Sequence, residues 1–166
     1  MDAARGISHP ELVPELVKVT LLALIPAQAG CGVFLGNGDK TIVFYIDPAI
    51  GATIHGYLNG QGSPRPLTHD LYSDTLQAFG GRVSRLVIMH MEEDVYYARL
   101  IPEAENEIME RKIVELDCRP SDGLAISARC GSPVYVAYEL WEQLEDMSAL
   151  LEQLQSQEDD GPFPPY

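Results

Sequence analysis

Residues 115–136 read ELDCRPSDGLAISARCGSPVYV, and this stretch carries the main signals for the fold. A β-like run over residues 112–117 leads into the pair Arg119-Pro120. A helix is expected over residues 121–130, since Gly131 supplies a typical helix end, and Val134–Ala137 is a further β-like run. The stretch therefore predicts strand, helix, strand, with the helix starting directly after an Arg-Pro pair.

Outward from this stretch, β-like and helical segments follow one another in irregular order. Strands are expected over Leu16–Ile25, Gly32–Leu35, Thr41–Ile46, Val83–His90 and Val95–Ile101, and helices over about 48–58 and 68–79. The turn GNGD at 36–39 predicts a tight hairpin, and Asp47-Pro48 is a typical helix start. Because strands and helices do not alternate strictly, the pattern favours a single α+β domain with a mixed or antiparallel sheet.

The C-terminal region has a helical pattern of apolar residues. Its members recur at spacings of four and three: Leu140, Leu144, Met147, Leu151 and Leu154. They predict an amphipathic helix over about 139–157, which fits docking on its own domain and a dimer interface equally well. The expected organisation is a flexible arm at 1–13, a domain at 14–139, the helix at 140–157, and a disordered acidic, Pro-rich tail at 158–166.

Composition restricts the function classes. The 166 residues carry a formal net charge of −14, which disfavours a protein that coats nucleic acid. Residues 139–160 hold eight of the acids and no Lys or Arg, leaving about −6 for the rest, so a local basic patch remains compatible with the sequence. Three cysteines without a C-x-x-C pair indicate neither a disulfide framework nor a thiolate zinc site, and favour the cytoplasm. The apolar run near residue 20 lacks the positive flank of a signal peptide and is too short to span a membrane.

A second Arg-Pro phrase, RPLTHDL at 65–71, echoes RPSDGLA at 119–125. Each phrase can be explained as a helix start, in which Thr68 or Ser121 accepts a hydrogen bond from a free N–H group and Asp70 or Asp122 suits the positive end of the helix dipole. Capping gives no reason for the arginine that opens each phrase. An arginine before a helix start can bind a carboxylate or a phosphate.

Two arrangements of the phrases are open if the helix starts lie near one another. In the first, Asp70 and Asp122 hold a divalent metal, Mg²⁺ or Mn²⁺, while the two arginines bind a phosphate. In the second, Arg65 pairs with Asp122 and Arg119 pairs with Asp70, which would make the phrases structural ion pairs. The candidate residues in both are Arg65, Thr68, His69, Asp70, Arg119, Ser121 and Asp122.

The phrases RPLTHDL and RPSDGLA, together with VYYARLI at 95–101, closely resemble the bifunctional nuclease domain family of bacteria and plants. The resemblance spans roughly residues 17–139. It implies an α+β domain that forms oligomers, a dimer being favoured, and for some plant members a nuclease activity on RNA and DNA. One departure is at Ile50, where the family usually has a glutamate in its first helix.

Two functional hypotheses follow. In the first, the chain is a nuclease that hydrolyses RNA or DNA with a metal on Asp70 and Asp122, His69 as general acid or base, and Arg65 and Arg119 on the phosphate, with Thr68 and Ser121 adding binding contacts. The acidic charge then implies weak binding of the substrate. In the second, the chain is a non-catalytic binding or assembly module without a cofactor. Neither hypothesis involves a membrane.

Overall fold

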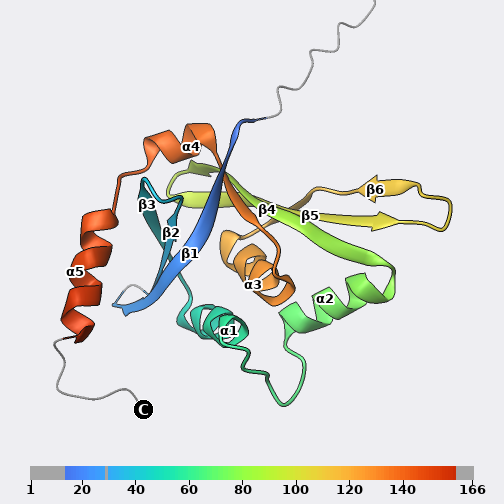
Figure 1. Ribbon diagram of the computed structural model, residues 1–166, viewed down its shortest axis with the longest axis horizontal. Coiled ribbons are helices and arrows are strands. Elements are labelled where there is room, and N and C mark those ends of the chain that lie inside the picture. The colour runs from blue at the N-terminus through green and yellow to red at the C-terminus, as the bar shows by residue number, and fades with distance from the viewer. Residues whose placement is uncertain (1–13, 29, 160–166) are drawn as a thin grey trace, which may run out of the picture.

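The computed structural model describes residues 14–28 and 30–159 as a mixed eight-stranded sheet with five helices. The strand order is β3-β2-β1-β8-β4-β5-β6, with β7 also paired to β5 (Figure 1). All neighbouring strands are antiparallel except β4 (Gly81–Glu92) and β8 (Val134–Ala137), which run parallel. The predicted α+β class with a mixed sheet is confirmed.

The first half of the sheet is built by β1 (Leu16–Ala27), β2 (Gly30–Gly36) and β3 (Thr41–Ile46). The predicted hairpin joins β2 to β3. Its turn is held by the Asn37 side chain, whose Oδ1 accepts hydrogen bonds from the N–H groups of Asp39 and Lys40, both at 3.0 Å. β1 changes partner along its length, pairing with β8 over its first residues and with β2 over the rest, and so connects the two halves of the sheet.

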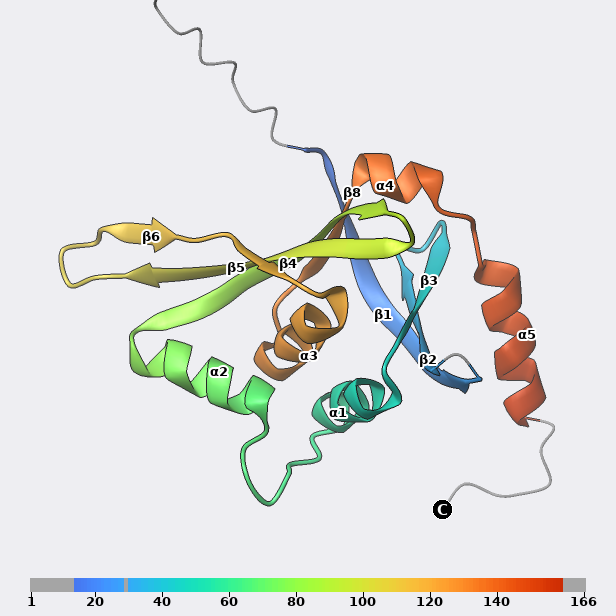
Figure 2. The ribbon, with the colours of Figure 1, turned by 180° about the vertical axis from the view of Figure 1, so that it is seen from behind.

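Three helices stand in a row along one side of the sheet (Figures 1 and 2). They are α1 (Pro48–Leu58), α2 (Thr68–Ala78) and, between them, α3 (Pro120–Cys130), close to their predicted bounds. α3 is the central one: seven of its eleven residues are buried, among them Leu124, Ala125 and Ile126. The outer helix α2 has no buried residue. The core therefore lies under α1 and α3, and α2 packs at its margin.

The β-like run at 112–117 forms two short strands instead of one. These are β6 (Arg111–Ile113) and β7 (Leu116–Cys118), which pair with successive parts of β5 (Val95–Glu105). The chain is redirected between them, where the N–H of Val114 donates to the carbonyl of Pro102 at 3.0 Å. β5 is longer than predicted, and with β6 it forms an arm that extends away from the helices of the body (Figure 1).

The predicted C-terminal helix is present, but it is preceded by a separate short helix. α4 (Tyr138–Gln143) and α5 (Ser148–Asp159) are divided at Asp146, whose Oδ1 accepts hydrogen bonds from the Ser148 N–H and from Thr41 N–H of β3. A single helix over 139–157 is therefore wrong. Leu140 and Leu151 are buried in the chain's own core, so the apolar stripe docks on its own domain and is not one continuous exposed surface.

Two expectations concern the termini of the chain. The arm at 1–13, and residues 160–166 of the tail predicted at 158–166, lie outside the described residues. Residues 158 and 159 were predicted to belong to the disordered tail but are the last residues of α5, so this part of the prediction is wrong. Within residues 14–28 and 30–159, none of the helices is both long enough and apolar enough to cross a bilayer.

Candidate functional site

The two Arg-Pro phrases do start helices, but with different residues at the caps than predicted. Leu67 is the cap residue of α2 and Arg119 that of α3, so Thr68 and Ser121 lie inside the helices and make no capping bond. The capping expectation for these hydroxyls is wrong. At the start of α2, Asp70 makes the capping hydrogen bond instead: its Oδ2 accepts from the Leu67 N–H at 2.8 Å. Ser121 is buried, whereas Thr68 is exposed.

Because α2 packs against α3, the starts of the two helices come together. His69 Nε2 lies 3.3 Å from Asp122 Oδ1, a contact between residues that are 53 positions apart in the chain. Asp122 is held in place by Arg119, whose Nε and Nη2 donate to its two oxygens at 2.7 and 3.1 Å. The His69 side chain is 16% exposed and that of Asp122 31%, so both are sheltered without being closed off. The arrangement is an imidazole oriented by a carboxylate.

Asp70 faces a different partner on α3. Arg129 Nε donates to Asp70 Oδ1 at 2.7 Å, and Arg129 Nη2 lies 3.5 Å from Asp74 Oδ1, one helical turn after Asp70. The three residues line a polar cavity of about 400 Å³, together with Tyr57 of α1 and the loop between α1 and α2. The buried Tyr57 hydroxyl lies beside Asp70 and has no hydrogen-bond partner among the described residues.

The cross-pairing expected for the two phrases is therefore wrong. Arg119 pairs with Asp122 of its own phrase, and Asp70 pairs with Arg129, which belongs to neither phrase. Arg65 is exposed in the loop before α2 and makes no salt bridge within the described part of the chain. The expected cluster consequently exists as two adjoining groups, His69–Asp122–Arg119 and Asp70–Arg129–Asp74, joined through consecutive residues of α2.

Hydrogen bonding keeps both aspartates ionised. The hydrogen bond from Arg119 lowers the pKa of Asp122, with further help from His69. Burial alone would raise the pKa of Asp70, but the hydrogen bonds from the Leu67 N–H and from Arg129 outweigh burial, and the net pKa is lowered. Burial and the nearby Asp70 carboxylate raise the pKa of Tyr57 to about 12, so this hydroxyl stays protonated.

The side chains of the site are not arranged as a complete set of ligands for a divalent metal. Among residues 14–28 and 30–159, no group of three or more His, Cys, Asp or Glu side chains is placed to hold one. Asp70 and Asp122 each already accept a hydrogen bond from an arginine. A cation bound by either carboxylate would have to compete with that guanidinium. The residue that replaces the family glutamate, Ile50, packs against the apolar core and provides no ligand.

Three residues at the site were not among the sequence candidates: Tyr57, Asp74 and Arg129. The last two carry a usable signal, because Asp74 is four residues after Asp70, and Arg129 is seven residues after Asp122. Those spacings place each on the same helix face as the candidate. Tyr57 carries no such signal, since its position beside Asp70 depends on how α1 packs against α3.

Comparison with known proteins shows the family of the chain. The model of the bifunctional nuclease domain matches residues 33–148. An uncharacterised protein of Mycobacterium tuberculosis is 37% identical over 100 residues, which cover 60% of this chain and 56% of that protein. Bifunctional nuclease 1 of Oryza sativa subsp. japonica is 32% identical over 74 residues, 44% of this chain and 22% of the rice protein. The chain thus spans about half the length of the mycobacterial relative and a smaller part of the plant one. It belongs to the bifunctional nuclease domain family.

Proposed function

We propose that this chain hydrolyses phosphodiester bonds of RNA or DNA, with His69 as the acid–base residue and Asp122 as its positioning partner. The observation that supports this most is the 3.3 Å contact between His69 Nε2 and Asp122 Oδ1, which joins the two Arg-Pro phrases. The family and the name of the rice relatives support the same reaction class.

The chemistry needs a group that takes a proton from the attacking oxygen and returns one to the leaving oxygen. A histidine serves both roles near neutral pH, and a neighbouring carboxylate fixes its ring orientation and stabilises the charged imidazolium. In this proposal, His69 accepts the proton of the attacking water as that oxygen bonds to phosphorus. The P–O bond to the leaving oxygen breaks, and the proton is delivered there. Asp122 remains ionised throughout, because Arg119 lowers its pKa.

In this proposal, the arginines of the site bind the phosphate group of the substrate. The Arg119 side chain is 72% exposed and donates to Asp122 through Nε and Nη2, so its remaining N–H groups are free to bind a phosphate oxygen. Arg65 is exposed in the loop that leads into α2. Arg129 lines the adjoining cavity and presents a third guanidinium. The three arginines are balanced by Asp70, Asp74 and Asp122 at the same site, so few phosphate contacts and hence modest affinity are expected.

The proposal also allows for a divalent metal, and the test below is therefore carried out with and without one. Asp70 and Asp122 are the residues that would hold Mg²⁺ or Mn²⁺, each in competition with its arginine. Such an ion would add Lewis-acid stabilisation of the phosphate charge. No step above depends on it, since His69, Asp122 and the arginines account for proton transfer and phosphate binding.

The test is cleavage of single-stranded RNA and DNA by purified protein, with Mg²⁺, with Mn²⁺ and with EDTA. We expect His69→Ala to lower the cleavage rate about 10²–10⁴-fold, the usual contribution of a general acid or base. His90→Ala is the matched control, because His90 is exposed on β4 and stacks on Tyr97, outside the site. Equal activity in both variants would show that the cleavage comes from other residues or from a contaminant.

The alternative is a non-catalytic assembly module, favoured by the pairing of both motif aspartates with arginines. In that case the pair that joins two helices matters most, namely Arg129 with Asp70. Arg129→Ala should then lower the free energy of unfolding by about 1 kcal/mol, because the guanidinium is 40% exposed and solvent screens the pair. Arg119→Ala should leave the melting temperature unchanged, since its pair is local. Absence of any nuclease activity together with this ranking would favour the module.

A further inference from the structure

An apolar groove of about 620 Å³ runs along α2, between this helix and the arm formed by β5 and β6. One wall is a single face of α2 and its C-cap, whose lining residues recur at helical spacings of three and four: Thr68, Leu71, Tyr72, Thr75, Leu76 and Phe79. The facing wall comes from β5 and from the chain between Lys112 and Leu116. Leu71 is 62% exposed and Phe79 84%. An exposed apolar surface of this kind marks an interaction site.

One end of the groove lies at the site proposed for phosphodiester cleavage. Thr68, the first lining residue, directly precedes His69, and Leu116 on the facing wall lies three residues before Arg119. Because α2 has eleven residues, the groove follows the helix for about 16 Å from there to Phe79. A nucleic acid strand with one phosphate on Arg119, beside His69, would therefore pass directly into the groove.

The groove carries little net charge. Among the described residues of its lining, the charged side chains are Lys112, which is exposed, and Glu103, which is buried and ion-paired with Arg82 and with Arg111. A surface with one free cation, in a chain of net charge −14, gives the phosphates of a strand little attraction. The part of a strand that this groove can bind is therefore its uncharged part, the bases.

The lining offers ring faces and aliphatic side chains, which are the surfaces on which bases stack. Phe79 exposes most of its ring, and Tyr72 is half-buried in the same face of α2. Stacking tolerates any sequence, since every base has an aromatic face. Apart from the charged residues, the polar side chains of the lining are the hydroxyls of Thr68 and Thr75, so few groups can read a base edge. The groove suits unpaired bases, whereas the paired bases of a duplex stack on one another and present no free face.

We propose that the groove binds the unpaired bases of the substrate on one side of the cleaved bond, with Phe79 as the outermost stacking residue. This inference rests on the proposed function, and it adds a substrate preference: single strands over duplexes, with little selectivity for sequence. At about 3.4 Å per nucleotide in a stacked strand, a groove of about 16 Å spans up to about five nucleotides.

The first test is binding of a fluorescent DNA decamer in EDTA, followed by anisotropy, with the intact length of the decamer checked on a gel. The single strand should bind at least about tenfold more tightly than the same decamer annealed to its complement. Phe79→Ala should weaken single-strand binding about tenfold, the usual effect of removing one stacking ring. Because Phe79 is 84% exposed, its removal does not open the core, and an unchanged melting temperature verifies this.

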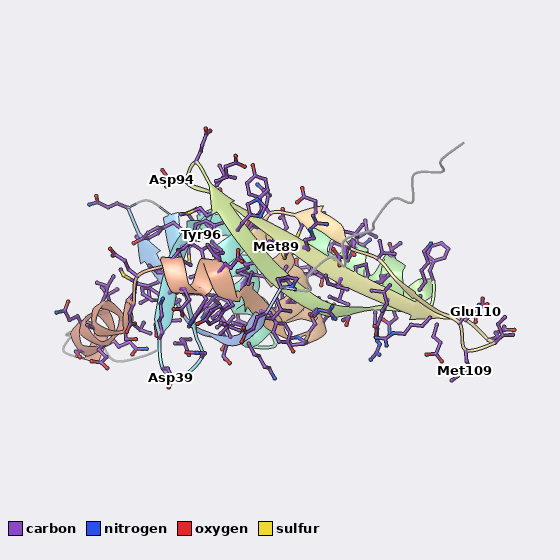
Figure 3. All side chains as sticks on the ribbon, turned by 90° about the horizontal axis from the view of Figure 1, so that it is seen from above. Asp39, Met89, Asp94, Tyr96, Met109 and Glu110 are labelled. Carbon is purple, nitrogen blue, oxygen red and sulfur yellow. The ribbon has the colours of Figure 1, made fainter. Side chains whose placement is uncertain are left out.

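Tyr45→Ala is the matched control and should bind the decamer as the wild type does. Tyr45 is also an exposed aromatic residue, but it lies on β3, at the opposite end of the strand order from β5 and β6. Figure 3 shows the same separation, with Asp39 of the β2–β3 turn and Met109 of the arm at opposite sides of the molecule.

The second test removes the bases and keeps the backbone. A decamer without bases should bind at least about tenfold more weakly than the normal single strand, and it should bind the wild type and Phe79→Ala equally. Equal binding of the normal decamer by these two proteins would overturn the proposal and leave the groove to another occupant, such as a protein chain. Equal binding of single strand and duplex would overturn it as well.

The nuclease proposal and the groove proposal fail by different results. A chain that binds single strands through Phe79 but cleaves neither RNA nor DNA would contradict the nuclease proposal alone. A chain that loses cleavage with His69→Ala, and whose binding of single strands does not depend on Phe79, would contradict the groove proposal alone.

Discussion

At the scale of single residues, the site depends on contacts that hold carboxylates in their ionised form. Asp122 and Asp70 each accept hydrogen bonds from an arginine, and the pKa of each is lowered. The arginine is local for Asp122, three residues earlier in the chain, and distant for Asp70, 59 residues later. The two aspartates therefore look alike in sequence but contribute differently: Asp122 orients His69, and Asp70 fastens α2 to α3.

Asp70→Asn is expected to change how stability depends on pH. A carboxylate with a lowered pKa in the folded state stabilises the fold above the unfolded-state pKa of about 4, and this contribution is lost as pH falls through the folded-state value. The variant should therefore melt at a lower temperature than the wild type at pH 7, and the difference should shrink as the pH falls below about 4. Thermal melts followed by circular dichroism across this range measure it.

Asp39→Asn serves as the control for this prediction, because Asp39 lies in the exposed turn between β2 and β3. The melting temperature of the Asp39→Asn protein should equal that of the wild type at every pH. A gap between Asp70→Asn and the wild type that stays constant down to pH 2 would mean that the charge of Asp70 is not what stabilises the fold.

At the scale of elements, close approach of a helix to the sheet sets the position of the site. α1 rests on β2 at Gly51, where an added Cβ would lie 2.7 Å from Cys31 Sγ and 2.8 Å from Cys31 Cβ. Real Cβ atoms do not approach so closely, so the glycine is required for this spacing. Because α1 packs against α3, a shift of α1 would also move Tyr57 relative to Asp70.

Gly51→Ala should lower the free energy of unfolding by about 1–3 kcal/mol, the usual cost of forcing extra volume into a packed contact. Gly56→Ala, in the same helix, should instead stabilise the protein by up to about 1 kcal/mol, because alanine is the better helix former. An added Cβ there meets only the Gln61 carbonyl oxygen at 3.5 Å, an ordinary contact. Urea denaturation of the two variants gives the comparison, and equal effects of the same sign would contradict the packing argument.

Element positions were largely predictable from the sequence, because they depend on local signals. The Asn-Gly turn at 36–39, the Asp47-Pro48 helix start and the Arg-Pro phrases fixed the bounds of β2, β3, α1, α2 and α3 closely. The failures arose where a distant contact redirects the chain. Val114 bonds to Pro102 and divides one expected strand into two, and Asp146 binds Thr41 and divides one expected helix into two.

At the scale of the whole molecule, the net charge of −14 opposes the approach of a nucleic acid, so few phosphate contacts are expected. If Arg65, Arg119 and Arg129 contribute about three such contacts, the logarithm of the association constant should fall with the logarithm of salt concentration with a slope of about −2. Fluorescence anisotropy with a single-stranded oligonucleotide measures this slope. Removing Arg119 should reduce the size of the slope by about 0.7. Arg99→Ala should leave the slope unchanged, because Arg99 lies on β5 and is paired with Glu115.

The pairing of the site residues was the part of the molecule that sequence could not supply. Both phrases were recognised, and the structure does bring His69 to Asp122. Arg119 and Asp122 are three residues apart and pair locally, but the pairing of Asp70 with Arg129 depends on how α2 packs against α3, and no local pattern encodes that. Exposure of α2 was hidden for the same reason, since its leucines look like core residues in sequence, yet α2 packs beside α3 at the margin of the core and α3 takes the buried position.

The most direct measurement of the central claim is a double-mutant cycle on the cleavage rate of single-stranded RNA with His69→Ala, Asp122→Asn and the two combined. If His69 and Asp122 act as one unit, the double variant should lose about as much activity as His69→Ala alone, because an aspartate that works through the imidazole has nothing left to orient. The folded state of each variant is checked by its melting temperature. Losses that multiply in the double variant, or a fully active His69→Ala protein, would contradict the account.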